Sequence, residues 1–76
     1  MDRAIAMHIA NLIGRLIHLE DLARQHGPNM GRDREHDAIE WTLHDLGERY
    51  PAEVAEAEII AEDRQRRRAE RAQYGR

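Results

Sequence analysis

The chain has 76 residues, no cysteine and a net charge of −3. At this length folding removes only about 60% of the surface that the extended chain exposes, so a core within one small domain is marginal. The lack of cysteine excludes disulfide bonds, thiol catalysis, thiolate zinc sites and iron–sulfur clusters. Helix packing, oligomerisation or a metal held by histidines and carboxylates must therefore stabilise the fold.

The charge is unevenly distributed along the chain. Residues 33–63 hold eleven acidic residues and two arginines, whereas residues 64–76 hold six arginines and one glutamate. We therefore expect a single helical domain over 1–76, with a body over 1–63 and an Arg-rich C-terminal extension over 64–76.

Residues 2–26 have the pattern of one long helix. Apolar residues at 5, 9, 12, 16, 19 and 23 follow alternating steps of four and three, and a second file lies at 6, 10, 13 and 17. Asp2 is a good N-cap, and Gly27 followed by Pro28 predicts the end of the helix.

A second helix is expected from about residue 33 to 50, after a loop over 27–32. Asp33 can cap this helix, and Pro51 ends it and suits the first turn of the next. The face expected to meet the first helix has residues at steps of three and four: His36, Ile39, Leu43, Leu46 and Tyr50.

The third helix, from about residue 51, is rich in Ala, Glu and Arg. Its apolar stripe is thin, with Val54, Ala57 and Ala61 on one side, while Ile59 and Ile60 are expected to point elsewhere. Beyond residue 63 the pattern allows either a longer helix, supported by pairs such as Glu62–Arg66 and Asp63–Arg67, or fraying. The predicted fold class is all-α, a small helical bundle.

The first helix has a wider apolar face than a hairpin partner can cover. Either the third helix or a second copy of the chain must cover the rest, and a homodimer is favoured. The predicted oligomer interface consists of Ile5, Ile9, Leu12, Ile13, Leu16, Ile17 and Leu19.

Trp41 is the only tryptophan, and on a helical wheel it lies opposite the apolar face of the second helix. An exposed indole among polar residues is typical of an interface hot spot. Its expected companions in a partner-binding surface are Asp37, Glu40, Asp45 and Glu48. Two alternatives stay open: the third helix covers Trp41 and makes it core, or the acidic residues only keep the chain soluble.

Histidine and glutamate alternate along one side of the second helix. Such spacing can bring an imidazole nitrogen and a carboxylate oxygen to one divalent cation. The candidate ligands are His36, Glu40, His44 and Glu48, with His18, Glu20 and Asp21 of the first helix in reach. A solvated face is the simpler interpretation, so no cofactor is expected. His36 itself is expected to be partly buried, either neutral or as part of a pH-sensitive interface.

The basic end suggests nucleic acid as an alternative partner, because its arginines could neutralise phosphates and Tyr74 could stack on a base. The arginines concerned are Arg64, Arg66, Arg67, Arg68, Arg71 and Arg76. The competing interpretation is a solvated or subunit-bridging tail.

Nucleophilic catalysis has almost no candidate residue. The only side-chain alcohols besides tyrosine belong to Thr42, and a chain of this size forms no deep cleft. No stretch is apolar enough to span a membrane and no signal segment is evident, so a cytoplasmic location is expected. The leading hypothesis is a non-enzymatic protein-binding module, an inhibitor or regulator that docks on a basic, nucleic-acid-handling protein.

Overall fold

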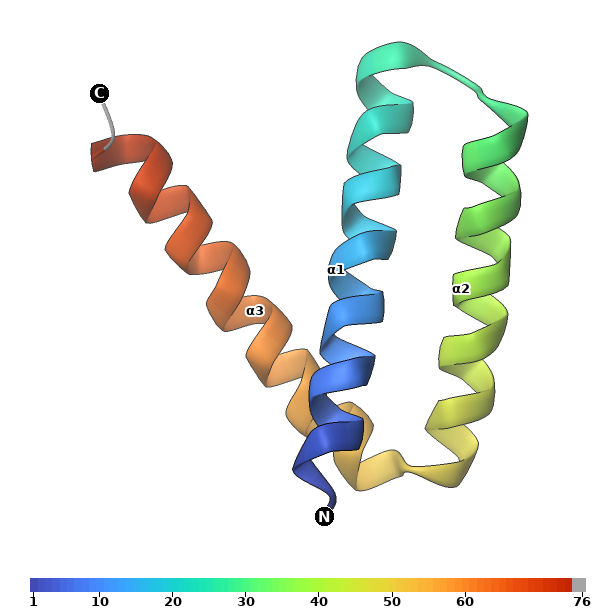
Figure 1. Ribbon diagram of the computed structural model, residues 1–76. Helices are drawn as coiled ribbons and strands as arrows, with labels where there is room; N and C mark the ends of the chain where they lie inside the picture. Colours follow the sequence, from blue (N-terminus) through green and yellow to red (C-terminus); the bar gives the residue numbers. More distant parts are fainter. Residues whose placement is uncertain (75–76) are drawn as a thin grey trace.

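The structure of the protein is a computed structural model that describes residues 1–74. These residues form three helices: α1 (Arg3–His26), α2 (Met30–Arg49) and α3 (Pro51–Tyr74). Within residues 1–74 there is no β-strand, so the prediction of an all-α bundle is confirmed. Figure 1 shows α1 and α2 side by side as an antiparallel hairpin, while α3 crosses α1 near its N-terminal end and then diverges from it.

Both ends of α1 follow the local signals in the sequence. The Asp2 side chain accepts hydrogen bonds from the backbone N–H groups of Ala4 and Ile5, at 2.9 and 3.2 Å. At the other end Gly27 has a φ of 78°, a conformation that favours glycine, and its N–H donates to the carbonyl of Ala23 at 2.9 Å. The predicted cap and stop are thus confirmed.

Removing the cap of α1 should measurably destabilise the protein. We expect Asp2→Ala to lower the free energy of unfolding by about 1 kcal/mol, because two N–H groups of the first turn lose their acceptor. Urea unfolding followed by circular dichroism measures this loss. Asp2→Asn restores a good capping side chain and should remain close to the wild type; an equal loss in both variants would contradict a capping role.

The start of α2 differs from the prediction. The helix begins at Met30, and its N-cap is Asn29, whose side chain accepts a hydrogen bond from the N–H of Arg32 at 3.0 Å. Asp33 lies instead within the first turn, where a negative charge suits the helix dipole. Asparagine caps a helix as well as aspartate does, so α2 can begin one turn earlier than predicted. The loop before it is therefore shorter than predicted and spans residues 27–29.

The start of α3 is tied to the start of α1. Glu53, in the first turn of α3, is buried, and its Oε2 accepts the backbone N–H of Asp2 at 2.6 Å. This hydrogen bond joins two residues that are 51 positions apart in the sequence. It fixes the point from which α3 begins to cross α1.

Small side chains form the contact between α1 and α3. Ala6 and Ala10 of α1 and Ala57 and Ala61 of α3 are all buried, which allows the two helix backbones to approach closely. The predicted stripe of α3 is therefore confirmed, and α3 provides part of the cover that the broad apolar face of α1 needs.

The core lies where the three helices meet. Ile9 is 1% exposed and is the largest fully buried side chain. Around Ile9, Ala10 and Ala57 pack partly buried residues from all three helices: Ile5, Ile13, Leu43, Leu46, Tyr50, Val54 and Ile60. The prediction that Ile60 points away from the core is wrong, because α3 crosses α1 at an angle that brings this side chain inward. Ile59 is 61% exposed, as expected.

The fold is flat, because its Cα atoms extend over 38 × 34 × 13 Å. With α1 in the middle, α2 and α3 each keep an uncovered outer face (Figure 1). None of the helices in the described part of the chain carries an apolar stretch that could span a bilayer.

The arginine-rich segment continues α3 as regular helix as far as Tyr74. Its first turn is stabilised by Asp63, which pairs with Arg66 at 2.6 Å and with Arg67 at 3.0 Å. Of the two alternatives left open by the sequence, the longer helix is thus the one found. The expected pair Asp63–Arg67 is present, and Arg66 pairs with Asp63 rather than with Glu62.

Candidate functional site

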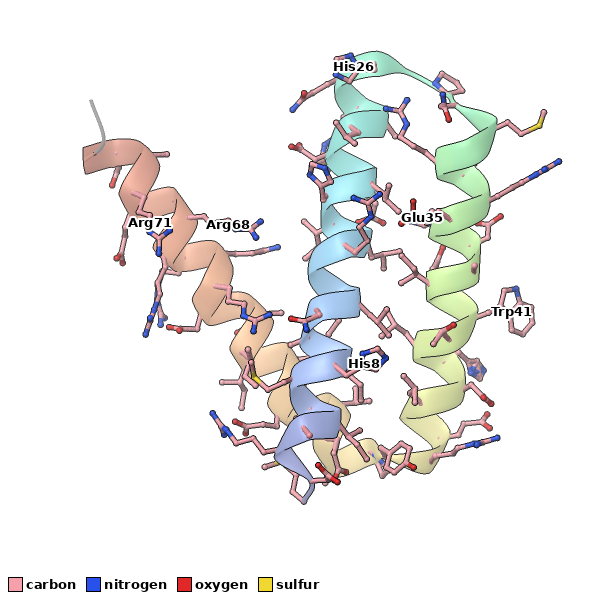
Figure 2. All side chains as sticks on the ribbon, viewed as in Figure 1. His8, His26, Glu35, Trp41, Arg68 and Arg71 are labelled. Carbon is pink, nitrogen blue, oxygen red and sulfur yellow. The ribbon has the colours of Figure 1, made fainter. Side chains whose placement is uncertain are left out.

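Trp41 stands on the outer face of α2, away from α1 (Figure 2). Its side chain is 75% exposed, the largest exposed fraction among the big apolar residues described. The helix that could have covered it, α3, packs on α1 instead. The interpretation of Trp41 as a core residue is therefore wrong.

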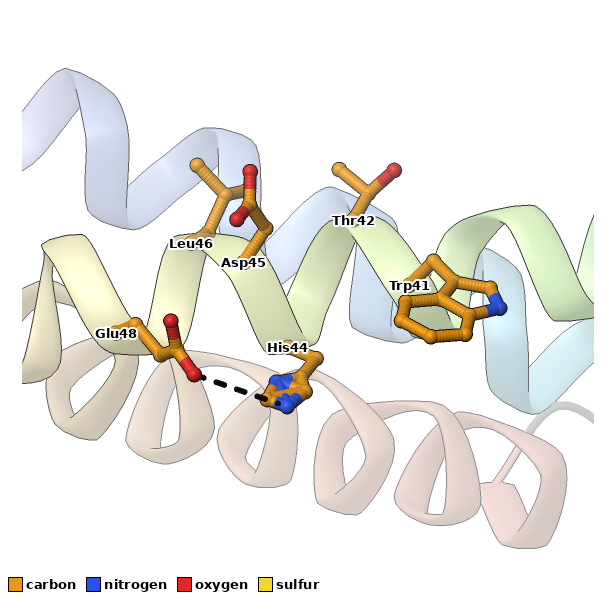
Figure 3. Close-up of a pocket in the computed structure, with 6 residues that line it drawn as sticks. All are labelled: Trp41, Thr42, His44, Asp45, Leu46 and Glu48. Atoms are coloured by element: carbon orange, nitrogen blue, oxygen red, sulfur yellow. Dashed lines mark ion pairs between the residues drawn. The ribbon is translucent and has the colours of Figure 1, made fainter.

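Helical spacing gathers acidic residues and a histidine around the indole. Positions 37, 41, 44 and 48 are separated by steps of four and three, so they share one side of α2. His44 stacks on the Trp41 ring, with centroids 6.4 Å apart and planes inclined by 2°. Glu48 follows, with its Oε1 3.8 Å from Nε2 of His44 (Figure 3). Asp37, Glu40 and Asp45 are exposed on the same outer surface.

Two shallow hollows flank the indole. One, of about 310 Å³, is lined by Asp37, Glu40, Trp41 and His44. The other, of about 550 Å³, is lined by Trp41, Thr42, His44, Asp45, Leu46 and Glu48 (Figure 3). Both are open surface depressions formed by a single helix, so they suit the side chains of a docking protein better than an enclosed small molecule. We call the outer surface of Asp37, Glu40, Trp41, Asp45 and Glu48 the Trp41 face.

The predicted His–Glu stripe divides into two separate pairs. His36 lies between α1 and α2: its Nε2 is 3.0 Å from Glu20 Oε2, and its Nδ1 is 2.9 Å from Glu40 Oε1. His44 and Glu48 lie further along, beside the indole. The four candidate ligands are therefore not brought to one point.

The candidate metal ligands of α1 are also divided. Glu20 reaches His36, whereas Asp21 pairs with Arg24 at 3.1 Å on its own helix and His18 faces the space between α1 and α3. Ligand atoms of His36, Asp37 and Glu40 do lie within 4.8 Å of one another. Both nitrogens of His36 already face carboxylates, so ion pairing accounts for the cluster.

The carboxylates around His36 favour its protonated form. The hydrogen bond that Glu20 accepts from the imidazole raises the pKa of His36 above its ordinary value of 6.5, and the charge of Glu40 acts in the same direction against partial desolvation. As a cation, His36 links Glu20 of α1 to Glu40 of α2. The predicted location of His36, partly buried in the α1–α2 contact, is correct.

Stability should depend on pH through His36. Because its pKa is higher in the folded state, its contribution is fully present below about pH 6.5 and is lost as the pH rises through the raised folded value. We expect the free energy of unfolding, measured in urea across this range, to fall more steeply in the wild type than in His36→Gln. His44→Gln removes an imidazole that links no two helices and should keep the wild-type slope; the same slope in His36→Gln would contradict the assignment.

A second ion pair between α1 and α2 was not predicted from the sequence. Arg15 donates from Nε and Nη2 to the two carboxylate oxygens of Glu35, at 2.7 and 3.0 Å. The hydrogen bond from Arg15 lowers the pKa of Glu35, so this pair contributes at neutral pH and is lost as the pH falls through the lowered value. The residues are 20 positions apart, and no local pattern pairs them.

The arginines proposed for nucleic-acid binding are largely engaged within the chain. Arg64 donates to Asn11 Oδ1 at 2.8 Å and lies 3.9 Å from Met7 Sδ. Arg66 and Arg67 pair with Asp63, and no ion pair among the described residues involves Arg68 or Arg71. Arg76 and the side chain of Tyr74 lie outside what the structure describes.

The residues predicted for a homodimer interface fall into a buried group and a partly exposed group. Ile9 and Leu19 are buried within the chain, at 1% and 2% exposure, so in this fold they have no surface left for a second copy. The other residues of the set remain partly exposed: Ile5, Leu12, Ile13, Leu16 and Ile17.

The chain was also compared with known proteins. It matches no protein-family model, no curated protein and no solved structure. The function therefore has to be argued from the surfaces of the chain itself.

Proposed function

We propose that the protein is a non-enzymatic binding module that docks through its Trp41 face on a basic surface of a nucleic-acid-handling protein and thereby regulates it. The observation that supports this most is the 75% exposure of the only tryptophan. Tryptophan is the residue type most enriched at the energetic centres of interfaces. Binding becomes more favourable when a partner removes the apolar surface of an exposed indole from water.

The chemistry of the partner follows from the charges around the indole. Asp37, Glu40, Asp45 and Glu48 are exposed acidic residues. The basic groups beside them are His36, which lies near Asp37 and Glu40, His44 near Glu48, and Arg49 near Asp45. An acidic rim of this kind speeds encounter with a basic surface and adds specificity more than affinity. Proteins that bind nucleic acids carry such basic surfaces.

Direct binding of nucleic acid by the chain has weaker support. Three of its candidate arginines already bond to Asn11 or Asp63, and the largest exposed apolar side chain lies among carboxylates that repel phosphate. Arg68 and Arg71, which form no ion pair with another described residue, provide a smaller positive surface than the sequence suggested.

Capture from an extract of the native host tests the proposal. The full chain, immobilised at one terminus, should retain a basic protein, identified by mass spectrometry, and duplex nucleic acid added to the column should release it. Trp41→Ala should lose about thirtyfold or more in affinity for that protein, as expected of a hot spot. The retained amount should also fall as salt screens the acidic rim.

Ile59→Ala is the matched control, because it removes a similarly exposed apolar side chain from α3. It should bind like the wild type, and both variants should keep the wild-type helix content. Equal capture by wild type and Trp41→Ala would contradict the proposal, as would a partner that nucleic acid does not displace.

A further inference from the structure

A cleft opens where α3 diverges from α1. Its volume is about 490 Å³, and residues of both helices line it: Ala10, Asn11, Gly14, Arg15, Ile17, His18, Ala61, Arg64, Gln65 and Arg68. Figure 1 shows the two helices separating on this side, opposite the outer face of α2. The floor is made of small and aliphatic side chains, and the rim carries the polar ones.

The cleft differs in charge from the rest of the chain. Within the described residues its lining contains three arginines and a histidine and no carboxylate, in a protein whose net charge is −3. Arg15 is neutralised by Glu35, but Arg64 bonds only to an amide oxygen and a thioether sulfur. Arg68 extends from the side of α3 that faces α1 (Figure 2). The cleft therefore presents uncompensated positive charge above an apolar floor.

The Trp41 face has the complementary chemistry. It offers one large apolar side chain surrounded by carboxylates, whereas the cleft offers an apolar floor bordered by arginines. The two surfaces lie on opposite sides of α1, so one chain cannot bring them together. Two copies of the chain can bring the Trp41 face of one against the cleft of the other.

We propose that the cleft between α1 and α3 binds the Trp41 face of a second copy of this chain, head to tail. The indole lies against Gly14 and Ile17, the partly exposed residues of the floor, where Arg68 can stack on its ring, and the carboxylates of α2 meet Arg64 and Arg68. The proposal rests on the Trp41 face being a docking surface, as proposed above. Self-association then hides that surface and competes with the regulated partner.

Such a contact is heterologous, which has a consequence for assembly. Each copy has one donor face and one acceptor cleft, and joining them leaves one of each free. Wild-type protein should thus assemble beyond a dimer as its concentration rises. A symmetric dimer through α1 would instead stop at two copies.

Sedimentation equilibrium of three chains and one mixture tests this directly. Trp41→Ala disables the donor face and Arg68→Glu disables the cleft, so each alone should associate about thirtyfold or more weakly and remain monomeric where the wild type assembles. An equimolar mixture of the two should form a dimer and nothing larger, because one intact face and one intact cleft remain. This complementation is unique to a head-to-tail contact.

Two further variants control for charge and folding. Arg71→Glu makes the same change in net charge on the same helix outside the lining of the cleft, and it should assemble like the wild type. Gly14→Leu fills the floor without a change in charge. A Cβ at this position meets no atom within 4 Å, so we expect the variant to keep the wild-type helix content and to lose self-association.

A wild-type chain that stays monomeric would overturn the inference, as would dimers that persist in both single variants or a mixture that stays monomeric. Binding of an acidic helix from another protein in the cleft, without self-association, would also overturn it. In each of these cases the proposed function would still be supported if the chain captures a basic protein and this capture depends on Trp41. Loss of that capture with complementation intact would overturn only the proposed function.

Discussion

Ile9→Ala should lower the free energy of unfolding by about 2–5 kcal/mol, the usual range for a buried isoleucine reduced to alanine. Ile9 is the largest fully buried side chain and lies at the meeting point of all three helices. The lost methylene and methyl groups leave a cavity that the surrounding side chains can fill only in part. A loss of this size approaches the whole stability of a chain of this length.

Urea unfolding followed by circular dichroism measures this effect, with Ile59→Ala as control. Ile59 is 61% exposed, so its truncation should change stability by no more than about 0.5 kcal/mol. Equal effects in the two variants would show that the core lies elsewhere. If Ile9→Ala is already unfolded in buffer, Ile9→Val should fold with a loss of about 0.5–1.5 kcal/mol.

Ala57→Leu is the second large effect expected. Ala57 is fully buried and packs with Ile9 and Ala10 of α1, where a small side chain allows this helix separation. A leucine there forces the helices apart or into strained rotamers, with a loss of about 1–3 kcal/mol. Because the divergence of α3 begins at this crossing, the shape of the cleft should change as well.

Ala55→Leu makes the same substitution two residues earlier, at an exposed position of α3. Leucine and alanine have similar helix propensities, so this control should remain within about 0.5 kcal/mol of the wild type. The free energy of unfolding in urea distinguishes the two variants. A stable Ala57→Leu with wild-type self-association would contradict the close packing of α1 and α3.

The helices could be predicted because their signals are local. Asp2 and Gly27 mark the ends of α1 by their own backbone chemistry, and Pro51 marks the start of α3. The position of Trp41 opposite the apolar face of α2 was also predictable, since it depends only on helix geometry, whereas its exposure depends on where α3 packs. Asn29 and Asp33 are both good capping residues four positions apart; the prediction chose Asp33, whereas Asn29 is the N-cap and the helix begins at Met30.

The packing of α3 could not be predicted in the same way. The inward position of Ile60 depends on the angle at which α3 crosses α1, and the crossing is fixed by contacts such as Asp2–Glu53 between distant residues. Arg15–Glu35 is likewise a tertiary contact without a sequence spacing of its own. The acid-free cleft arises from this packing, so no pattern along one helix could reveal it.

Fluorine NMR of the chain labelled with fluorotryptophan tests most directly whether Trp41 is a docking anchor. Trp41 is the only tryptophan, so one resonance reports on one side chain even beside a partner's own tryptophans. In dilute free protein the resonance should show the solvent isotope shift of an exposed indole; on addition of the captured basic protein it should move and lose that shift. A resonance insensitive to solvent in the dilute free chain, or unchanged by a bound partner, would contradict the central role of Trp41.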